Sequence, residues 1–380
     1  MHHCRISFLL VAVIFLSMQS EIFAQVSGLD AITKAGARLE KVTGDMTFDT
    51  AGSPCYVNGV LFFTNNNFDD LMKSRVFKMT APGKIELIRE NNGMTATLKL
   101  NKSGNLFACE MMGHRVIEMD TSGKVLRVVV NEYNGKRIDG PNDMVIDRKG
   151  GFYFTDSQFI GKVQKMQDTP AVYYVTPDGA IKRVVSDVVF PNGIALSPDR
   201  KILYLANTQG KYILAYDVES DGSLVNARNF TELELSKENI AKKSEMSGTD
   251  GVAVDSAGNV FAATTQGVGI QVFDKYGKHL GNISCPAATN NCAFGGKDLK
   301  TLYVSAKDGI YKIAVKKRGF LSFNPSLTVN RQFRGILRVS IQKKQQLTLI
   351  YLTKKRSVTF CNLSKLTLDA TDIMCILHPV

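Results

Sequence analysis

The chain has few features of a zinc-binding, membrane-spanning or nucleic-acid-binding protein. It contains no CxxC motif and no cysteine–histidine cluster with zinc spacing. Beyond residue 24, no segment is long and apolar enough to cross a bilayer. The net charge of +12 is concentrated at one end, because 12 Lys/Arg and two Asp/Glu lie from Lys316 onward. The body from Val26 to Val315 carries 34 basic and 32 acidic residues, so we expect no nucleic-acid partner.

The N-terminus resembles a secretory signal. Arg5 precedes the apolar stretch Ile6–Leu16, and Ala24 ends a polar region, which predicts a signal peptide over residues 1–24. We therefore expect an exported protein, periplasmic or secreted, in which disulfides are permitted. Six cysteines remain after residue 24, and Cys285 and Cys292 are the one pair whose spacing suggests a disulfide worth testing. The others are expected to be buried thiols.

A short phrase recurs six times along the body of the chain. Each copy has an apolar strand, a turn rich in Gly or Asp, and a second strand with an aromatic residue. The aligned aromatic residues are Phe62, Phe107, Tyr153, Tyr204, Phe261 and Tyr303. Their spacings of 45, 46, 51, 57 and 42 residues are typical of propeller blades. Each copy is followed by a second hairpin with its own Gly-containing turn.

The repeats predict an all-β fold, a six-bladed β-propeller with four antiparallel strands per blade. We assign it to residues 25–317, and Leu39–Phe48 is available as the outer strand that closes the last blade. Phe230–Ser247 is polar and is expected to be a surface loop. Residues 318–380 form a basic segment without repeats. It is interpreted as an appended β element, a basic tail, or sequence foreign to the domain, for instance through an altered reading frame.

One position per repeat is expected at the mouth of the central channel, where each innermost strand begins. Counting back from the aromatic residues gives Gly52, Ala96, Asn142, Asn192, Asp250 and Asn291. Four of the six are Asn or Asp, whose oxygens suit a hard divalent cation such as calcium or magnesium. A cation with open positions can polarise a carbonyl and activate water. The alternative is that these residues serve only turn geometry.

Several segments closely resemble the gluconolactonase/senescence-marker (regucalcin-like) family. They are PNDMVIDRKGGFYFTDS, PNGIALSPDRKILYLANT, TDGVAVDSAGNVF and NNCAFGGKDLKTLYVS. ACEMMGHRVIEMD followed by NGKRIDGPND is similar to the bacterial gluconolactonase branch. The resemblance runs from Gly44 to Lys316 through all six blades. It implies a propeller that opens sugar or other lactones with one bound divalent cation, calcium first, with magnesium, zinc or manganese as alternatives.

The resemblance also implies roles for particular residues. Asn192 and Asp250 are the expected metal ligands, and Asp250 would also orient or deprotonate the attacking water. Asn142 and Asp143 are expected to contact metal or substrate. Glu110 and Arg115 would line the substrate approach, with a plain surface role as the alternative.

The chain departs from the family pattern in its first two repeats. The family has an EGP motif in blade one whose Glu is a metal ligand, whereas this chain has AGSPCY, with Gly52 at the Glu position. Ala96 stands where an NGL motif has Asn. Loss of a carboxylate should weaken cation binding. Two functions therefore stay open: a lactone hydrolase, and a catalytically impaired propeller that binds a sugar acid or a protein partner. Paraoxonase or strictosidine-synthase-like propellers are a less favoured third.

Overall fold

The computed structural model describes residues 28–158, 165–322, 337–342 and 346–351. The predicted signal peptide lies outside the described residues, as do Cys361 and Cys375, so these predictions stay untested. Contacts divide the chain into two units, residues 1–323 and 324–380. No helix in the described ranges is long and apolar enough for a membrane span.

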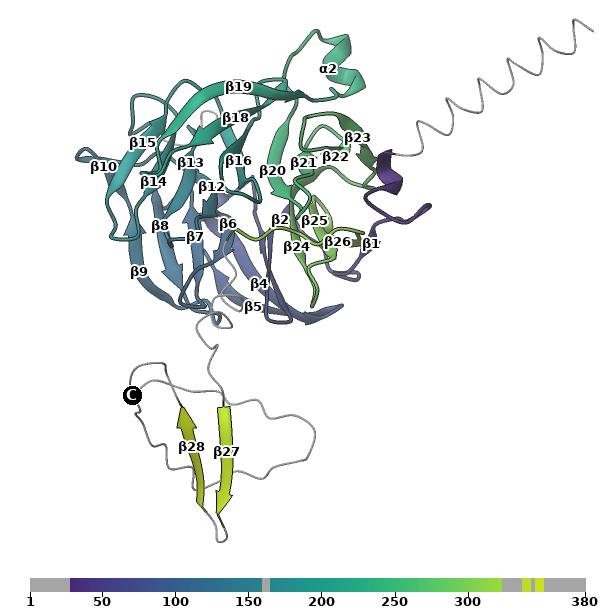
Figure 1. Cartoon of the computed structure of the whole chain (residues 1–380). Helices are drawn as coiled ribbons and strands as arrows, with labels where there is room; N and C mark the ends of the chain where they lie inside the picture. The colour runs from purple at the N-terminus through teal and green to yellow at the C-terminus, as the bar shows by residue number, and fades with distance from the viewer. Residues whose placement is uncertain (1–27, 159–164, 323–336, 343–345, 352–380) are drawn as a thin grey trace, which may run out of the picture. The chain divides into compact units, whose positions relative to one another are not determined.

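The first unit consists of six four-stranded antiparallel sheets around a central channel, which confirms the predicted propeller (Figure 1). The first three blades are β2 (Ala51–Val57), β3 (Val60–Asn65), β4 (Arg75–Ala81) and β5 (Lys84–Glu90); β6 (Thr95–Leu100), β7 (Leu106–Glu110), β8 (Arg115–Met119) and β9 (Val125–Val130); and β12 (Pro141–Ile146), β13 (Phe152–Asp156), β14 (Ala171–Val175) and β15 (Ile181–Val185). Short strands β10 (Glu132–Tyr133) and β11 (Lys136–Arg137) form a separate hairpin before the third blade.

The other three blades follow the same order. They are β16 (Pro191–Leu196), β17 (Ile202–Asn207), β18 (Tyr212–Val218) and β19 (Leu224–Glu232); β20 (Thr249–Val254), β21 (Val260–Thr264), β22 (Gly269–Phe273) and β23 (His279–Ile283); and β24 (Thr289–Gly295), β25 (Thr301–Ala306) and β26 (Gly309–Ala314) with β1 (Glu40–Lys41). Strand β1 pairs with β26, so the N-terminal part of the unit closes the last blade as predicted.

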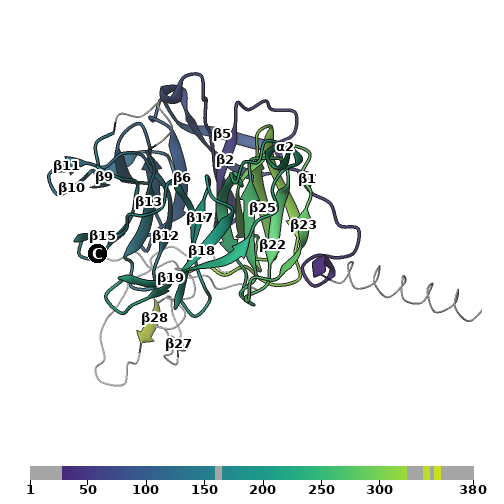
Figure 2. The ribbon, with the colours of Figure 1, turned by 90° about the horizontal axis from the view of Figure 1, so that it is seen from above.

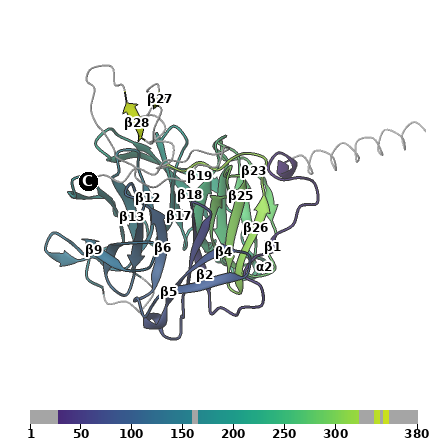
Figure 3. The same cartoon turned by 90° about the horizontal axis from the view of Figure 1, so that it is seen from below.

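The innermost strands contact one another in a closed ring, in the order β2, β6, β12, β16, β20, β24 and back to β2. Each pair of neighbouring blades shares one apolar core, as with Phe261 and Phe294 between the fifth and sixth blades. Figures 2 and 3 show strands of neighbouring sheets lying side by side in views turned by 90°. Because every blade packs on two others, the ring holds the start of each inner strand in a fixed place.

The turns between inner strands explain why the repeat is so regular. In the third blade the Asp147 carboxylate accepts hydrogen bonds from the backbone N–H groups of Lys149, Gly150 and Gly151. Gly150 has φ +98°, a conformation that a side chain would oppose. The Asp-x-x-Gly signal therefore specifies the hairpin locally.

Two stretches differ from the sequence-based expectation. Phe230–Ser247 was expected to be a loop, but Phe230 belongs to β19 and the short helix α2 (Lys237–Ala241) follows, begun by Ser236, whose hydroxyl accepts from Asn239 N. Beyond residue 317 the chain continues to pack on the propeller. Phe320 N donates to Val254 O at 2.9 Å, and Ser322 Oγ donates to Ile146 O at 2.5 Å.

Residues 320–322 help to line a cavity of about 130 Å³ at the far end of the channel from the predicted site. In Figure 1 this stretch crosses the ring in yellow-green. In the second unit, the two described segments pair as an antiparallel hairpin, β27 (Leu337–Gln342) with β28 (Gln346–Tyr351).

Cys285 and Cys292, the pair that the sequence left open as a disulfide, are both free thiols. Cys292 lies on inner strand β24 in the core between blades five and six, and its Sγ is 3.8 Å from Phe261 O. Cys285 follows strand β23 and only packs against the edge of that core. The short sequence separation therefore does not bring the two sulfur atoms together.

Candidate functional site at the channel mouth

A pocket of about 270 Å³ opens where the inner strands begin. Its lining includes Asn142, Asn192 and Asp250, three residues that the sequence assigned to the site. Each lies in a β-bulge at the second residue of its inner strand, at β12, β16 and β20 respectively. A bulge adds one residue and redirects the side chain, which here turns it to the mouth. Gly52 and Ala96 line the same pocket.

The sixth blade needs a correction of one residue. Ala293 pairs with Tyr303 as Val145 pairs with Tyr153, so Asn290, not Asn291, is the equivalent of Asn142. Asn291 instead corresponds to Asp143, because its Oδ1 accepts from the next backbone N–H in the same way. Both asparagines line the pocket. The mouth ring therefore carries amide oxygens at blades three, four and six and a carboxylate at blade five.

Asp250 is half-buried and is the one carboxylate among the described residues that line the pocket. Burial raises the pKa of Asp250 to about 8, and the negative charge of Asp143 adds to the rise, while a hydrogen bond from Asn192 opposes it. Without a positive partner this carboxyl is largely protonated at neutral pH. A cation in the pocket would reverse this balance.

Two buried amide oxygens at the mouth are unsatisfied. Among the described residues, neither Asn192 Oδ1 nor Asn66 Oδ1 has a hydrogen-bond partner, and both asparagines line the pocket. The Asn192 amide nitrogen donates to Thr208 Oγ1 at 3.0 Å, which fixes the oxygen on the other side of the amide. A buried polar atom without a partner is costly and indicates a missing ligand, ion or water. Asn66 was not among the residues expected from the sequence, because it follows strand β3 and does not lie on an inner strand.

These donors could hold one hard cation through the Asp250 carboxylate and amide oxygens. The described chain has no group of three or more His, Cys, Asp and Glu side chains arranged for a metal. The donor set is therefore poor in charge but rich in neutral oxygen, which suits calcium or magnesium better than a soft metal. Gly52 contributes no ligand, as its identity predicts.

Asp143 lies below the mouth pocket and not in its lining. Its carboxylate is buried, accepts from Thr97 Oγ1 at 2.9 Å and forms an ion pair with Lys99 Nζ at 3.3 Å. Burial lowers the pKa of Lys99, but the charge and hydrogen bond of Asp143 together with the neighbouring Cys55 and Cys292 outweigh it, and the pKa is raised. Asp143 influences the site through charge, since it raises the pKa of Asp250.

Glu110 is buried in an ion-pair cluster with the partly exposed Arg115, outside the described lining of the pocket. Glu110 is fully buried, and its two oxygens accept from Arg89 Nη2 and Arg115 Nε, each at 2.6 Å. With all its charge engaged by two guanidinium groups, Glu110 ties the second blade to strand β5 of the first. Neighbouring Met111, and not Glu110, reaches the pocket.

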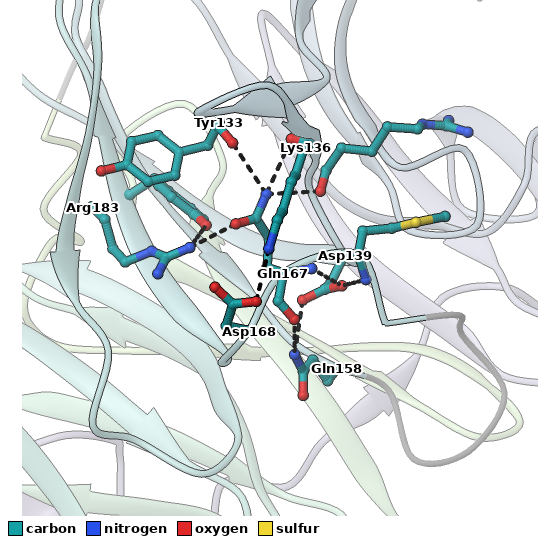
Figure 4. Close-up of polar contacts among 10 residues, drawn as sticks. Tyr133, Lys136, Asp139, Gln158, Gln167, Asp168 and Arg183 are labelled. Atoms are coloured by element: carbon teal, nitrogen blue, oxygen red, sulfur yellow. Dashed lines mark hydrogen bonds and ion pairs between the residues drawn. The ribbon is translucent and has the colours of Figure 1, made fainter.

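A polar network fixes the chain just before Asn142 (Figure 4). The buried Asp139 carboxylate accepts from Gln167 N at 3.0 Å and Gln158 Nε2 at 3.1 Å. Gln167 Nε2 in turn donates to the carbonyl oxygens of Tyr133, Lys136 and Arg137. Arg183 binds Gln167 Oε1 at 2.6 Å and stacks over Tyr133. The loop that leads into β12 is thereby held to the β10–β11 hairpin.

Asp156 completes this anchor from strand β13. Its carboxylate accepts from the backbone N–H groups of Asp139 and Gly140 at 2.9 and 2.7 Å. Burial raises the pKa of Asp156 to about 7, although the two N–H groups favour the ionised form. The position of Asn142, two residues after Gly140, thus rests on a buried carboxylate that the sequence did not single out.

Known proteins resemble this chain in sequence and in fold. The sequence model of the SMP-30/gluconolactonase/LRE-like region matches residues 50–308, more than half of the chain. This chain belongs to the SMP-30/gluconolactonase/LRE-like family. The family resemblance drawn from the blade motifs is thereby confirmed.

Curated relatives of this family member are named as lactonases. Gluconolactonase of Zymomonas mobilis is 31% identical over 242 residues, which cover 60% of this chain and 64% of that protein. The chain thus spans just under two thirds of the length of that relative. Lactonase drp35 of Staphylococcus haemolyticus is 27% identical over 266 residues, with 66% of this chain and 76% of that protein covered.

Solved structures share the propeller. A gluconolactonase from Xanthomonas campestris is 25% identical with a TM-score of 0.65, covering 76% of this chain and 93% of that one. A calcium-binding protein, regucalcin, from Agrobacterium tumefaciens is 16% identical with a TM-score of 0.60, covering 74% and 95%. At that identity the second likeness shows the fold alone.

Proposed function

We propose that this chain is a metal-dependent lactonase whose site is the channel-mouth pocket. The observation that carries the proposal is the pairing of one carboxylate, Asp250, with the unsatisfied amide oxygen of Asn192 in that pocket. Asp250, Asn192 and Asn142 would hold the cation, and Asn66, whose unsatisfied Oδ1 belongs to a residue of the same lining, would add an oxygen. When bound, the cation supplies Lewis-acid polarisation of the lactone carbonyl.

The residues of the chain perform the remaining steps. The ionised Asp250 accepts a proton from the attacking water while the oxygen of that water forms a bond to the carbonyl carbon of the lactone. The ring C–O bond then breaks, and the proton passes to the leaving alkoxide oxygen, so that lactone and water give one hydroxy acid. Asn142, in the same lining, would donate an amide N–H to an oxygen of the substrate. The Asn290 amide is already engaged, because its Nδ2 donates to Ala51 O at 2.7 Å and its Oδ1 accepts from Ser305 Oγ at 2.5 Å. Export to the periplasm or outside the cell stays part of the proposal, on the strength of residues 1–24.

Activity measurement tests this proposal directly. The chain, first dialysed against a chelator, is incubated with sugar lactones, the class that the family resemblance predicts, and with simple δ-lactones. Calcium, magnesium, zinc or manganese is added, and acid release is followed. We expect hydrolysis that needs an added cation. Hydrolysis at the same rate in chelator would overturn the metal requirement, and no hydrolysis with any cation would overturn the function.

The second candidate, a catalytically impaired propeller that binds a sugar acid or a protein partner, is favoured by one observation. Blades one and two present Gly52 and Ala96 at the mouth, so two of the six ring positions lack a donor. A cation or a sugar acid bound without turnover would support this candidate.

Cation binding should depend steeply on pH. Because burial raises the pKa of Asp250 to about 8 in the cation-free chain, a bound cation must displace a proton below that pH. We expect the apparent Kd for calcium to fall about tenfold for each unit of pH rise up to pH 8, and to level off above it. Isothermal titration calorimetry at pH 6, 7 and 8, in buffers of different ionisation enthalpy, should show release of nearly one proton at pH 6. A pH-independent Kd would mean that Asp250 is not a ligand.

A carboxylate restored at blade one should tighten cation binding. Gly52 has no positive φ, so its backbone accepts a side chain, but an added Cβ would lie 2.9 Å from Thr64 Oγ1. We therefore expect the double variant Gly52→Glu/Thr64→Ala to bind calcium at least about tenfold more tightly than Thr64→Ala, since charge count tunes calcium affinity. Calorimetry measures the change. Gly52→Gln/Thr64→Ala is the matched control, and an equal gain there would show that charge is not the cause.

A further inference from the structure

One side of the mouth pocket, at blade two, is apolar. Met94, Ala96 and Met111 line it. Phe68, after β3, and Phe190, just before β16, also belong to the lining of the pocket. Met94 and Met111 pack with Leu71 in a small apolar cluster separate from the six cores between blades. The oxygen-rich residues discussed above belong to blades three to six and to the loop after β3.

The backbone holds this apolar side in place. Met111 N donates to Met94 O at 3.0 Å, so the segments that carry the two methionines are tied together. Met94 adopts φ +59°, a conformation that is unfavourable for a side chain-bearing residue, and it is nevertheless kept at the pocket. A Cβ on Gly140 would lie 2.8 Å from Met111 Cγ, so that glycine leaves room for the Met111 side chain. The methionine side is therefore a built part of the site.

This side discriminates between kinds of lactone. A substrate hydroxyl placed against thioether and aromatic carbon loses its water without gaining a hydrogen bond, which is unfavourable. An alkyl group in the same place loses only unfavourable hydration. Methionine side chains are also flexible and adapt to substituents of different shape. Ala96, at the ring position where other blades carry Asn or Asp, removes the polar partner that a sugar hydroxyl would need.

We propose that the preferred substrates are lactones with an apolar alkyl or aryl substituent, and that Met94, Ala96 and Met111 bind this substituent. The inference rests on the proposed lactonase function and replaces the sugar lactone that the family resemblance predicts. The lactone carbonyl faces Asp250 and the asparagines, and the substituent extends toward blade two.

The test compares kcat/KM across a series of δ-lactones with calcium present. The series contains δ-valerolactone, δ-hexalactone, δ-octalactone and δ-decalactone, with glucono-δ-lactone alongside. We expect kcat/KM to rise about three- to fourfold for each of the first added methylenes, the gain that corresponds to burial of one CH₂. Octalactone should exceed gluconolactone at least tenfold. A higher kcat/KM for gluconolactone would overturn the inference while supporting the lactonase function.

Two variants test whether this side of the pocket causes the preference for apolar substituents. Met111→Gln should flatten the rise with chain length, whereas Met46→Gln, an exposed methionine outside the pocket lining, should keep it. Ala96→Asn should raise the ratio of kcat/KM for gluconolactone to kcat/KM for octalactone about tenfold. An unchanged ratio and an unchanged slope in both variants would overturn the assignment.

A binding measurement distinguishes failure of the lactonase function from failure of the apolar subsite. If no lactone is hydrolysed with any cation, the lactonase function fails, and calorimetry with the two product acids then decides the inference. Tighter binding of 5-hydroxyoctanoate than of gluconate in the presence of calcium would support the apolar subsite. Equal or weaker binding would overturn it.

Discussion

Replacement of Asp250 by asparagine is expected to lower kcat/KM for lactone hydrolysis by about a hundredfold to ten-thousandfold, the range for loss of a general base. Asp250 is the one carboxylate in the described lining of the mouth pocket, so no neighbouring acid can take its place there. The change also removes the single negative ligand from an otherwise neutral donor set, and calcium affinity should fall with it. Steady-state kinetics at saturating calcium separate the two effects, because excess cation restores binding but not the base.

The matched control is Asp45→Asn, which alters an exposed aspartate outside the pocket lining. It should leave kcat/KM and calcium binding unchanged. If Asp250→Asn keeps more than a tenth of the activity at saturating calcium, the proton acceptor is another group. If Asp250→Asn loses activity but binds calcium as the original chain does, Asp250 is the base and not a ligand.

The fold could be predicted from the sequence because its determinants are local. Asp147 and Gly150 specify a hairpin by their own hydrogen bonds and backbone conformation, and blades two and five carry turns of the same kind, with Asn101 and Gly104 and with Asp255 and Gly258. Aromatic residues such as Tyr153 recur at fixed positions on the second strand and fill the cores between blades. Closure by β1 was also foreseen, because residues 39–48 were the available strand-like stretch before the first blade.

The site could be predicted only where it follows the repeat. Asn142, Asn192 and Asp250 share a register position, and the structure brings all three into one pocket. The sixth blade was misplaced by one residue because its turn is two residues longer than that of the third blade, not one: Ala293 pairs with Tyr303, ten residues later, whereas Val145 pairs with Tyr153, eight residues later. Asn66 was missed because no repeat position marks the end of β3.

Long-range partners were beyond the reach of the sequence. Glu110 followed a family pattern toward the substrate, yet its partner Arg89 comes from the preceding blade and holds it in a buried ion pair. Asp143 likewise follows Asn142 directly in the PND motif, but the β-bulge directs these two consecutive side chains to different levels of the channel. Which of two adjacent polar residues faces the pocket is decided by strand pairing, and strand pairing is set by the whole blade.

Replacement of Asp143 by alanine is expected to destabilise the fold. The buried carboxylate of Asp143 accepts from Met144 N at 2.8 Å and Ile194 N at 3.4 Å and pairs with Lys99, whose side chain is 27% exposed. Asp143→Ala leaves that ammonium without its counter-charge inside the channel. We expect the free energy of unfolding to fall by about 3 kcal/mol, the lower end of the range for a broken buried pair, because Lys99 keeps some solvent contact. Urea unfolding followed by circular dichroism measures it, since the chain has no tryptophan for fluorescence.

The double variant Asp143→Asn/Lys99→Met identifies the cause. It removes both charges and keeps an oxygen for the two backbone donors, so most of the lost stability should return. A double variant as unstable as Asp143→Ala would mean that hydrogen-bond geometry, and not charge, makes Asp143 necessary. Calcium binding provides the other check on its role. If Asp143→Ala folds with unchanged stability but no longer binds calcium, Asp143 is a direct ligand, which is one of the two contacts, metal or substrate, that the family resemblance implies. Its place below the pocket is then not the one it occupies with the cation bound.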